Sequence, residues 1–453
     1  MRAIAILMTL VSTASANTLS VEEVEAAADR AFPAIVAARA DEDAARGELQ
    51  SARGGFDPVL HGKAAVLPFG YYEYERLDTW IEAPTPLYGT TFYGGYRVGV
   101  GHIPDYYGEY QTRSAGEVRA GVAVPLLRGG LTDKRRVGIA KAKLDVELAG
   151  LSVQQQRIEV RRAARQRYWE WVAAGKRLAI AEALLELAEK RHDVIAQRVE
   201  RGDLPAVERT DNEKAIAQRR AQQVTTVRGV EQAAIELSLF LRDDTGQPIV
   251  VDASRVPDTL PDPRALPELD GDLHLALQLR PEPRKLRLVR EQGELDLKLA
   301  RNELLPKLDV SFTVSKDLGR GSDTLRPVTG EVGIVLDVPL LFRAARGKVT
   351  ATSAKLRRTE AMLGYARDKV TAELRDAHSA LRGAQRRVEA TRRELELARE
   401  LERLERQRFE LGDSTLFFVN QREQATAETA LREIDALVDT QKATTAYDAA
   451  LAR

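Results

Sequence analysis

The feature that most constrains this chain is the segment EVGIVLDVPLLF at 331–342, because it alternates apolar and polar residues and then enters a long run without proline. One face of an extended chain here would carry only apolar side chains: Val332, Ile334, Leu336, Val338 and Leu340. The opposite face would carry Glu331, Gly333 and Asp337. After Pro339 the chain contains no further proline. The pattern predicts a strand with one apolar face that leads directly into a very long helix.

The same arrangement occurs earlier, where EVRAGVAVPLL at 117–127 precedes a run without proline that ends at Leu204. Shorter matches connect the two halves of the chain. Pro33 and Pro58 recur as Pro281 and Pro306 at an offset of 248, and VPLL at 124–127 recurs at 338–341 at an offset of 214. The first copy therefore holds about 34 additional residues (248 − 214) between Pro58 and Pro125. These matches predict that one structural unit occurs twice in the chain.

Each unit reads as helix, strand, loop, strand, long helix and helix. The expected strands are Val59–Leu67, Glu117–Leu126, Leu308–Ser315 and the strand that begins at Glu331, so that each chain has four. Helices are expected over Val21–Arg53 and Glu282–Leu304, and the residues from Pro68 to about Thr112 are interpreted as a loop. The predicted domains are a first repeat at 17–241, a proline-rich linker at 242–270 and a second repeat at 271–453.

Heptad spacing marks the long helices as coiled-coil partners. In the second copy the seam residues are Leu374, Leu381, Val388 and Leu395. In the first copy they are Leu144, Leu151 and Ile158, followed by Ala173, Ile180, Leu187 and Val194. A strict seven-residue repeat implies supercoiling around another helix. A helix from Lys134 to Arg201 would span roughly 100 Å, which is too long for a globular domain.

Composition excludes several classes of function. The 68 Lys and Arg residues balance the 68 Asp and Glu residues, so nucleic acid is not expected as a partner. Cysteine is absent, which excludes disulfides and thiol nucleophiles within this sequence. The five histidines lie far apart without metal-ligand spacing, and neither a phosphate-binding loop nor a catalytic constellation is visible. We therefore expect no enzyme activity, no cofactor and no bound metal.

Residues 1–16 have the features of a cleavable signal peptide. Arg2 supplies the positive charge, Ala3–Val11 the apolar core, and Ala14–Ala16 the small residues at the cleavage site. The apolar core is too short to span a bilayer as a helix. In an exported chain, strands of about 9–11 residues with one apolar face match the height of a transmembrane β-strand. Four strands cannot close a barrel, so several chains would share one, with the helices continuing it as a tube.

The repeat, the LLP-x-L-x-V-x-F pattern at 304–312, the VPLL junctions and the glycines at the hairpin turns resemble the TolC family of outer-membrane efflux proteins. The resemblance covers essentially the whole chain after residue 16. It implies an α+β membrane protein: a homotrimer with a twelve-stranded β-barrel in the outer-membrane lipid, continued by a periplasmic α-helical coiled-coil barrel. It also implies passive exit of substrates, with a periplasmic membrane-fusion adaptor and an inner-membrane transporter as partners. The alternative is a periplasmic coiled-coil adaptor or structural protein of an export machine.

Two hairpin turns are candidate contact sites for the adaptor: Gly202, Asp203 and Leu204 in the first copy, and Gly412, Asp413 and Ser414 in the second. In both turns the glycine is expected to end one helix in the left-handed conformation, and Asp or Ser414 to cap the next. Adaptor docking at these turns is implied by the resemblance alone.

A constriction of the tunnel is implied just after the turns, where relatives carry a ring of acidic residues in the second hairpin. Here those positions hold Phe418 and Gln421, whereas the first copy offers Glu208 and Asp211. The two acids either ring the entrance or only favour the positive end of a helix dipole. Phe418 belongs either to the hairpin core or to an apolar plug. Nine tyrosines between 71 and 110 indicate an aromatic girdle at a barrel mouth, with a sugar or phage contact as the alternative.

Overall fold

The computed structural model describes residues 18–104 and 110–453, so the signal peptide expected at 1–16 lies outside the described residues. Its helices are α1 (Val21–Ala31), α2 (Pro33–Arg53), α3 (Lys134–Glu200), α4 (Ala206–Ser238), α5 (Leu269–Leu279), α6 (Pro281–Asn302), α7 (Arg343–Glu410) and α8 (Leu416–Ala450). Its strands are β1 (Val59–Leu67), β2 (Tyr74–Pro84), β3 (Thr91–Gly101), β4 (Glu117–Pro125), β5 (Lys307–Asp317) and β6 (Thr329–Asp337). None of the described helices combines the length and the apolarity required to cross a membrane.

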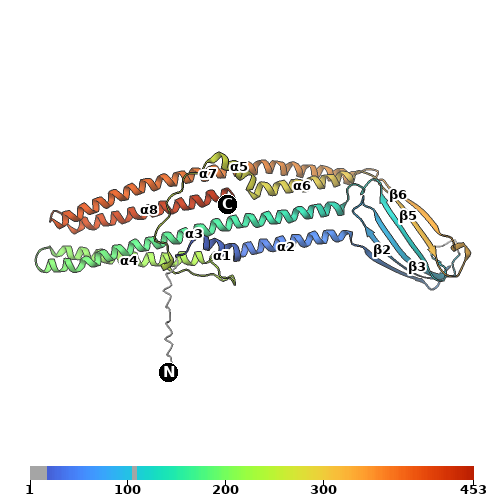
Figure 1. Cartoon of the computed structure of the whole chain (residues 1–453), viewed down its shortest axis with the longest axis horizontal. Coiled ribbons are helices and arrows are strands. Elements are labelled where there is room, and N and C mark those ends of the chain that lie inside the picture. Colours follow the sequence, from blue (N-terminus) through green and yellow to red (C-terminus); the bar gives the residue numbers. More distant parts are fainter. Residues whose placement is uncertain (1–17, 105–109) are drawn as a thin grey trace, which may run out of the picture. The chain divides into compact units, whose positions relative to one another are not determined.

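The strands form one antiparallel sheet in the order β1-β2-β3-β4-β5-β6 (Figure 1). The prediction of four strands per chain was wrong, because the described residues contain six. The expected loop between Pro68 and Thr112 holds the hairpin β2–β3, which accounts for most of the additional length of the first copy. Glycine at 94, 95, 99 and 101 interrupts the alternation of side chains in β3, so its sequence does not show the pattern of a strand.

Prolines decide where several helices begin. The single helix expected over Val21–Arg53 is two helices, since α1 ends before Phe32 and α2 starts at Pro33. The helix α6 starts at Pro281 and accommodates Pro283 in its first turn, where a backbone N–H has no partner within the helix. Ser20 caps α1 by accepting a hydrogen bond from the backbone N–H of Glu23 at 3.2 Å.

The chain divides into two compact units that do not follow the two sequence copies. The first unit comprises residues 1–38, 152–281 and 367–453, of which residues 18 onward are described. The second unit comprises 39–151 and 282–366, and it contains the whole sheet. Each unit thus combines segments from both halves of the sequence.

The helical unit has a core whose spacing follows the predicted heptads only in part. In α7 the predicted seam residues Leu374, Leu381, Val388 and Leu395 are all buried. In α3 the predicted seam residues Leu144, Leu151 and Ala173 are buried. Further along the helix the prediction was one residue out of register, because Ala181, Ala188 and Ile195 are buried whereas Val194 is exposed. The buried residues here also repeat every seven positions, and they follow the fully buried Trp171 and Val172.

Candidate functional site

The sheet has two faces of opposite character. The register places the following side chains on one face, called here the apolar face: Leu60, Ala64, Val66, Leu77, Ile81, Phe92, Val98, Val100, Val118, Val122, Val310, Phe312, Val314, Val332, Ile334 and Leu336. Many of these side chains are solvent-exposed in the isolated chain, including Leu336 at 61% and Leu77 at 47%. Monomeric soluble proteins rarely expose an apolar surface that runs continuously across a whole sheet. The face therefore requires an apolar medium or a covering partner.

The opposite face, called here the polar face, carries ion pairs among residues of three strands, β2, β3 and β4. Asp78 on β2 pairs with Arg76 at 3.0 Å and with Arg119 on β4 at 2.7 Å. Arg97 on β3 pairs with Glu117 on β4. On β5 and β6 the same face carries Asp309, Ser311, Thr313, Ser315, Glu331 and Asp337. These side chains suit contact with water. The register confirms the prediction that Leu336 and Asp337 lie on opposite faces of the sheet.

Both edges of the sheet are unoccupied within the described residues. β1 pairs only with β2, and β6 pairs only with β5. Every neighbouring pair in the sheet is antiparallel, so β1 and β6 run in opposite directions. An apolar sheet edge with unpaired backbone groups invites pairing with another chain.

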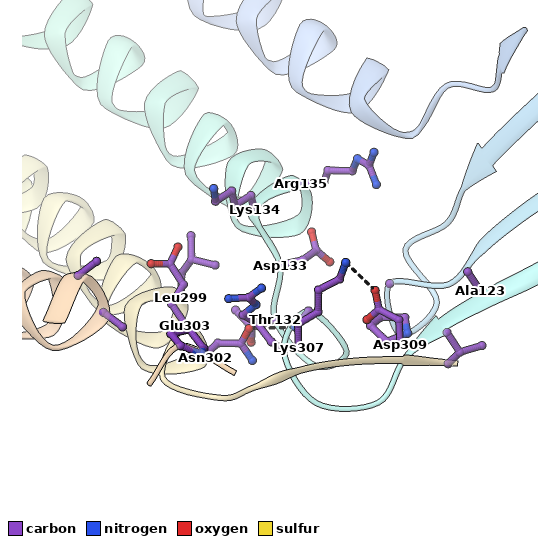
Figure 2. A pocket seen from close by; sticks show the side chains of 18 of the residues that line it. Ala123, Thr132, Asp133, Lys134, Arg135, Leu299, Asn302, Glu303, Lys307 and Asp309 are labelled. Atoms are coloured by element: carbon purple, nitrogen blue, oxygen red, sulfur yellow. Dashed lines mark hydrogen bonds and ion pairs between the residues drawn. The ribbon is translucent and has the colours of Figure 1, made fainter. Parts of the chain in front are cut away.

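A pocket of about 1200 Å³ lies where the strands meet the helices of the second unit. Figure 2 shows Asp133, Lys134, Asn302, Lys307 and Asp309 among its lining residues, with Lys307 directed toward Asp309. The ammonium group of Lys307 lies 3.3 Å from the carboxylate of Asp309. The backbone N–H of Gly129 donates a hydrogen bond to the side-chain carbonyl of Asn302 at 3.0 Å, which links the β4–α3 connection to α6. Apolar side chains such as Phe56, Leu299 and Phe342 line the pocket beside these charged groups.

The predicted hairpin turns form as expected at their glycines. Gly202 and Gly412 have φ values of +83° and +87°. In the first turn the N–H of Asp203 donates to the carbonyl of Arg198 at 2.8 Å, and the N–H of Gly202 to that of Val199 at 3.0 Å. The second turn repeats both bonds. This pair of bonds is the Schellman motif, which satisfies the last carbonyl groups of the preceding helix.

The expected capping of the following helices was wrong. Their N-cap residues are Pro205 and Thr415, and neither side chain makes a capping hydrogen bond. The Ser414 hydroxyl instead donates to Glu405. Both glycines and both aspartates of the turns are exposed, while Leu204 packs partly into a cluster with Leu416 and other apolar residues of the two tips.

Glu208 connects the two hairpins. Its side chain is only 7% exposed, and a carboxylate oxygen accepts a hydrogen bond from the backbone N–H of Leu416 at 3.0 Å. Leu416 is the first residue of α8, so the carboxylate from α4 satisfies an N–H group that the helix itself cannot. It also lies at the positive end of the α8 dipole. Glu208 thus performs the capping that Thr415 does not.

The other candidate gate residues are more accessible. Asp211 lines a groove of about 680 Å³ between the two hairpins, together with Gln421, Phe417 and Asn420. Phe418 is 49% exposed, and its ring contacts that of Phe417 edge-on, with centroids 5.5 Å apart. Gln421 is exposed as well. Asp211 and Gln421 therefore line the same groove. Glu208 is buried instead, and its carboxylate binds the first backbone N–H group of α8.

A buried carboxylate holds the four helices of the tips together. Glu423 on α8 has no exposed side-chain surface, and it pairs with Arg191 on α3, Arg219 on α4 at 2.9 Å and Arg406 on α7 at 3.4 Å. Arg219 also donates to the backbone carbonyl of Leu184 at 2.7 Å. Burial lowers the pKa of Arg191, and its attraction to Glu423 only partly offsets this effect, with Arg219 and Arg406 lowering the pKa further. Sequence analysis missed this cluster because its members come from four separate helices.

Comparison with known proteins agrees with this geometry. Residues 273–453 match the family described as outer membrane efflux protein. The pyoverdine export outer membrane protein OpmQ of Pseudomonas aeruginosa is 27% identical over 243 residues, and the alignment covers 53% of this chain and 48% of OpmQ. The matched region thus spans about half the length of that curated relative.

Solved structures match over nearly the whole chain. A membrane protein from Pseudomonas aeruginosa is similar with a TM-score of 0.65 and 18% identity, covering 95% of this chain and 93% of that one. The open state of the MtrE outer membrane channel of Neisseria gonorrhoeae gives a TM-score of 0.65 and 14% identity, covering 95% and 88%.

The fold is therefore that of the outer-membrane channels. Residues 273–453 match the outer membrane efflux protein family, in agreement with the resemblance seen in the sequence. Among these relatives, MtrE is described as an outer membrane channel and OpmQ as an export protein of the outer membrane.

Proposed function

We propose that the protein is an outer-membrane channel that gives passive exit to substrates exported from the cell. The observation that carries this proposal is the sheet with one apolar and one polar face and two free edges. In lipid every backbone hydrogen-bonding group requires a partner, so such a sheet has to close into a ring. The direction of β1 and β6 allows β6 of one copy to pair with β1 of the next in antiparallel fashion.

Three copies would form the ring, as family members generally do, with the apolar face toward lipid and the polar face toward water. The long helices would extend into the periplasm. The exposed turns at Gly202 and Gly412 are proposed to contact a periplasmic adaptor, which couples the channel to an inner-membrane transporter that supplies the energy. A periplasmic adaptor has no comparable need for a continuous apolar sheet face, and this observation favours the channel.

We further propose that the periplasmic entrance is set by Asp211, Phe418 and Gln421. Phe418 and Gln421 are exposed on α8, and Asp211 is half-buried on α4. Three copies would bring three Asp211 carboxylates around one axis, where they attract cations. Glu208 supports this entrance from within by joining the two hairpins through its bond to Leu416.

Membrane fractionation tests the main proposal. The full-length protein is expected to remain in the outer-membrane fraction after washing with high salt and with alkaline carbonate, and to be cross-linked as a trimer there. The purified protein should form ion-conducting pores in a planar bilayer. Release by salt alone, together with the absence of conductance, would support a periplasmic adaptor or structural protein instead.

A further inference from the structure

The hairpin β2–β3 is part of the sheet and is not an appendage at its end. β2 pairs with the whole length of β1, from Val59 opposite Glu82 to Leu67 opposite Tyr74. β3 pairs with β4 from Thr91 opposite Ala123 to Arg97 opposite Glu117. The hairpin therefore separates β1 from β4, the two strands that would be neighbours in a chain of four strands.

The turn of this hairpin is fitted to the rest of the sheet. Tyr88 donates a hydrogen bond from its hydroxyl to the carbonyl of Leu126 at 3.2 Å, at the end of β4. Gly89 has a φ of +68°, and a Cβ there would lie 2.5 Å from the carbonyl oxygen of Gly129. Only glycine combines this backbone conformation with so close an approach. The turn thus packs against the connection from β4 to α3.

The polar face fastens the hairpin to β4 across β3. Gly95 lies between Trp80 on one side and Arg119 on the other in the paired register. Because Gly95 has no side chain, the guanidinium of Arg119 crosses β3, lies 5.8 Å from the ring centroid of Trp80 and pairs with Asp78. Any Cβ at Gly95 would lie 2.6 Å from the Cβ of Trp80. A cation–π contact and a charged hydrogen bond together stabilise this bridge.

The apolar face continues across the hairpin, with Thr79 and Glu75 as the polar residues of β2 on that face. Leu77, Ile81, Phe92 and Val100 are each about half exposed or more, and they share this face with Ile334 and Leu336 of the β6 edge. A hairpin that projected into water would have no reason to present these side chains in register with the lipid-facing residues of its neighbours.

From these observations we propose that β2 and β3 are strands of the transmembrane wall, so that three copies of the chain close an eighteen-stranded barrel (three times six) bridged internally by Arg119 and Asp78. This inference rests on the proposed function, since it takes the trimer and the membrane from there. Barrel diameter grows roughly linearly with strand number, so this barrel is about 1.5 times as wide as one with twelve strands. Barrels of about sixteen to eighteen strands leave an aqueous channel.

Thiol labelling in intact outer membranes tests the inference, because the chain has no native cysteine. The single variants Leu77→Cys in β2, Leu336→Cys in β6 and Phe69→Cys in the β1–β2 connection are treated with a water-soluble maleimide. If β2 lies in the wall, Leu77→Cys reacts as slowly as Leu336→Cys, and at least tenfold more slowly than Phe69→Cys. If Leu336→Cys is protected and Leu77→Cys reacts like Phe69→Cys, the hairpin lies outside the wall and the inference fails. If all three react alike, the membrane location fails and the inference with it.

Excision of the hairpin supplies a second measurement. The backbone N–H of His102 donates to the carbonyl of Glu73 at 3.0 Å, so residues 74–101 can be removed and Glu73 joined to His102 without spanning a gap. The excision is combined with Arg119→Gln, since Asp78 is lost, and Arg119→Gln in the full chain serves as the control. Electron-microscopy averages viewed along the barrel axis should show a diameter about two-thirds (12/18) of the control. An unchanged diameter would overturn the inference.

Discussion

The substitution Glu423→Gln removes one negative charge from the centre of the hairpin tips with little change in shape. The carboxylate has no exposed surface, and it balances guanidinium groups from Arg191, Arg219 and Arg406. Glutamine can still accept a hydrogen bond through its carbonyl oxygen, but it provides no counter-charge. Three guanidinium groups are then left close together in a largely water-excluded site.

The expected cost follows from the burial of the cluster. Removing one partner of a buried ion pair costs about 3–5 kcal/mol, because the remaining charge is buried without compensation. Arg406 is partly exposed and can turn toward water or toward Glu402, with which it also pairs at 2.7 Å, so the lower end of this range applies. A loss of about 3 kcal/mol in the free energy of local opening corresponds to roughly a hundredfold increase in the opening equilibrium.

Amide hydrogen exchange measures this opening in the intact trimer. The backbone amides of α8 around Val419 to Ala427 should exchange about a hundredfold faster in Glu423→Gln than in the parent protein. Glu394→Gln is the matched control, because Glu394 pairs with Arg432 at the surface, where both side chains are about half exposed. Such a surface pair contributes less than about 1 kcal/mol. If the two variants change exchange to the same small extent, the cluster does not hold the tips together.

Three further outcomes are expected. Leu336→Arg should lower the stability of the folded protein by about 2–4 kcal/mol if residue 336 lies near the bilayer midplane, and the trimer should therefore dissociate in detergent at a lower temperature. Glu331→Arg on the polar face should leave this temperature unchanged. Equal effects of the two substitutions would contradict the assigned faces. Glu208→Gln should weaken the cap of α8 by about 1 kcal/mol and speed amide exchange in the first turn of that helix alone. Asp211→Asn should lower the cation preference of the pore in planar-bilayer recordings, whereas Phe418→Ala should raise conductance without altering ion preference; an unchanged preference in the first variant would remove Asp211 from the entrance.

Regular periodicity made much of the fold predictable from the sequence. The strand β6 and the seam of α7 follow strict repeats of two and seven residues. Pro327 and Pro339 flank β6, and Gly412 follows the end of α7. The glycines of the hairpin turns were equally clear, since a positive φ after a long helix favours glycine. In α3 the seam residues Leu144, Leu151 and Ala173 are buried as predicted, but beyond Ala173 the seam lies one residue later than predicted.

The sequence by itself therefore determined the strand–helix plan, the apolar and polar sides of the strands, and the positions of the turns, since all of these depend on residues close together along the chain. Only the tertiary structure decided that the sheet has six strands, because the glycines of β3 remove the side chains that would mark it as a strand. It also decided the roles of Glu208 and Glu423, whose partners Leu416 and Arg219 lie more than 200 residues away. Contacts across such separations depend on how the two halves of the chain pack, which local patterns do not record.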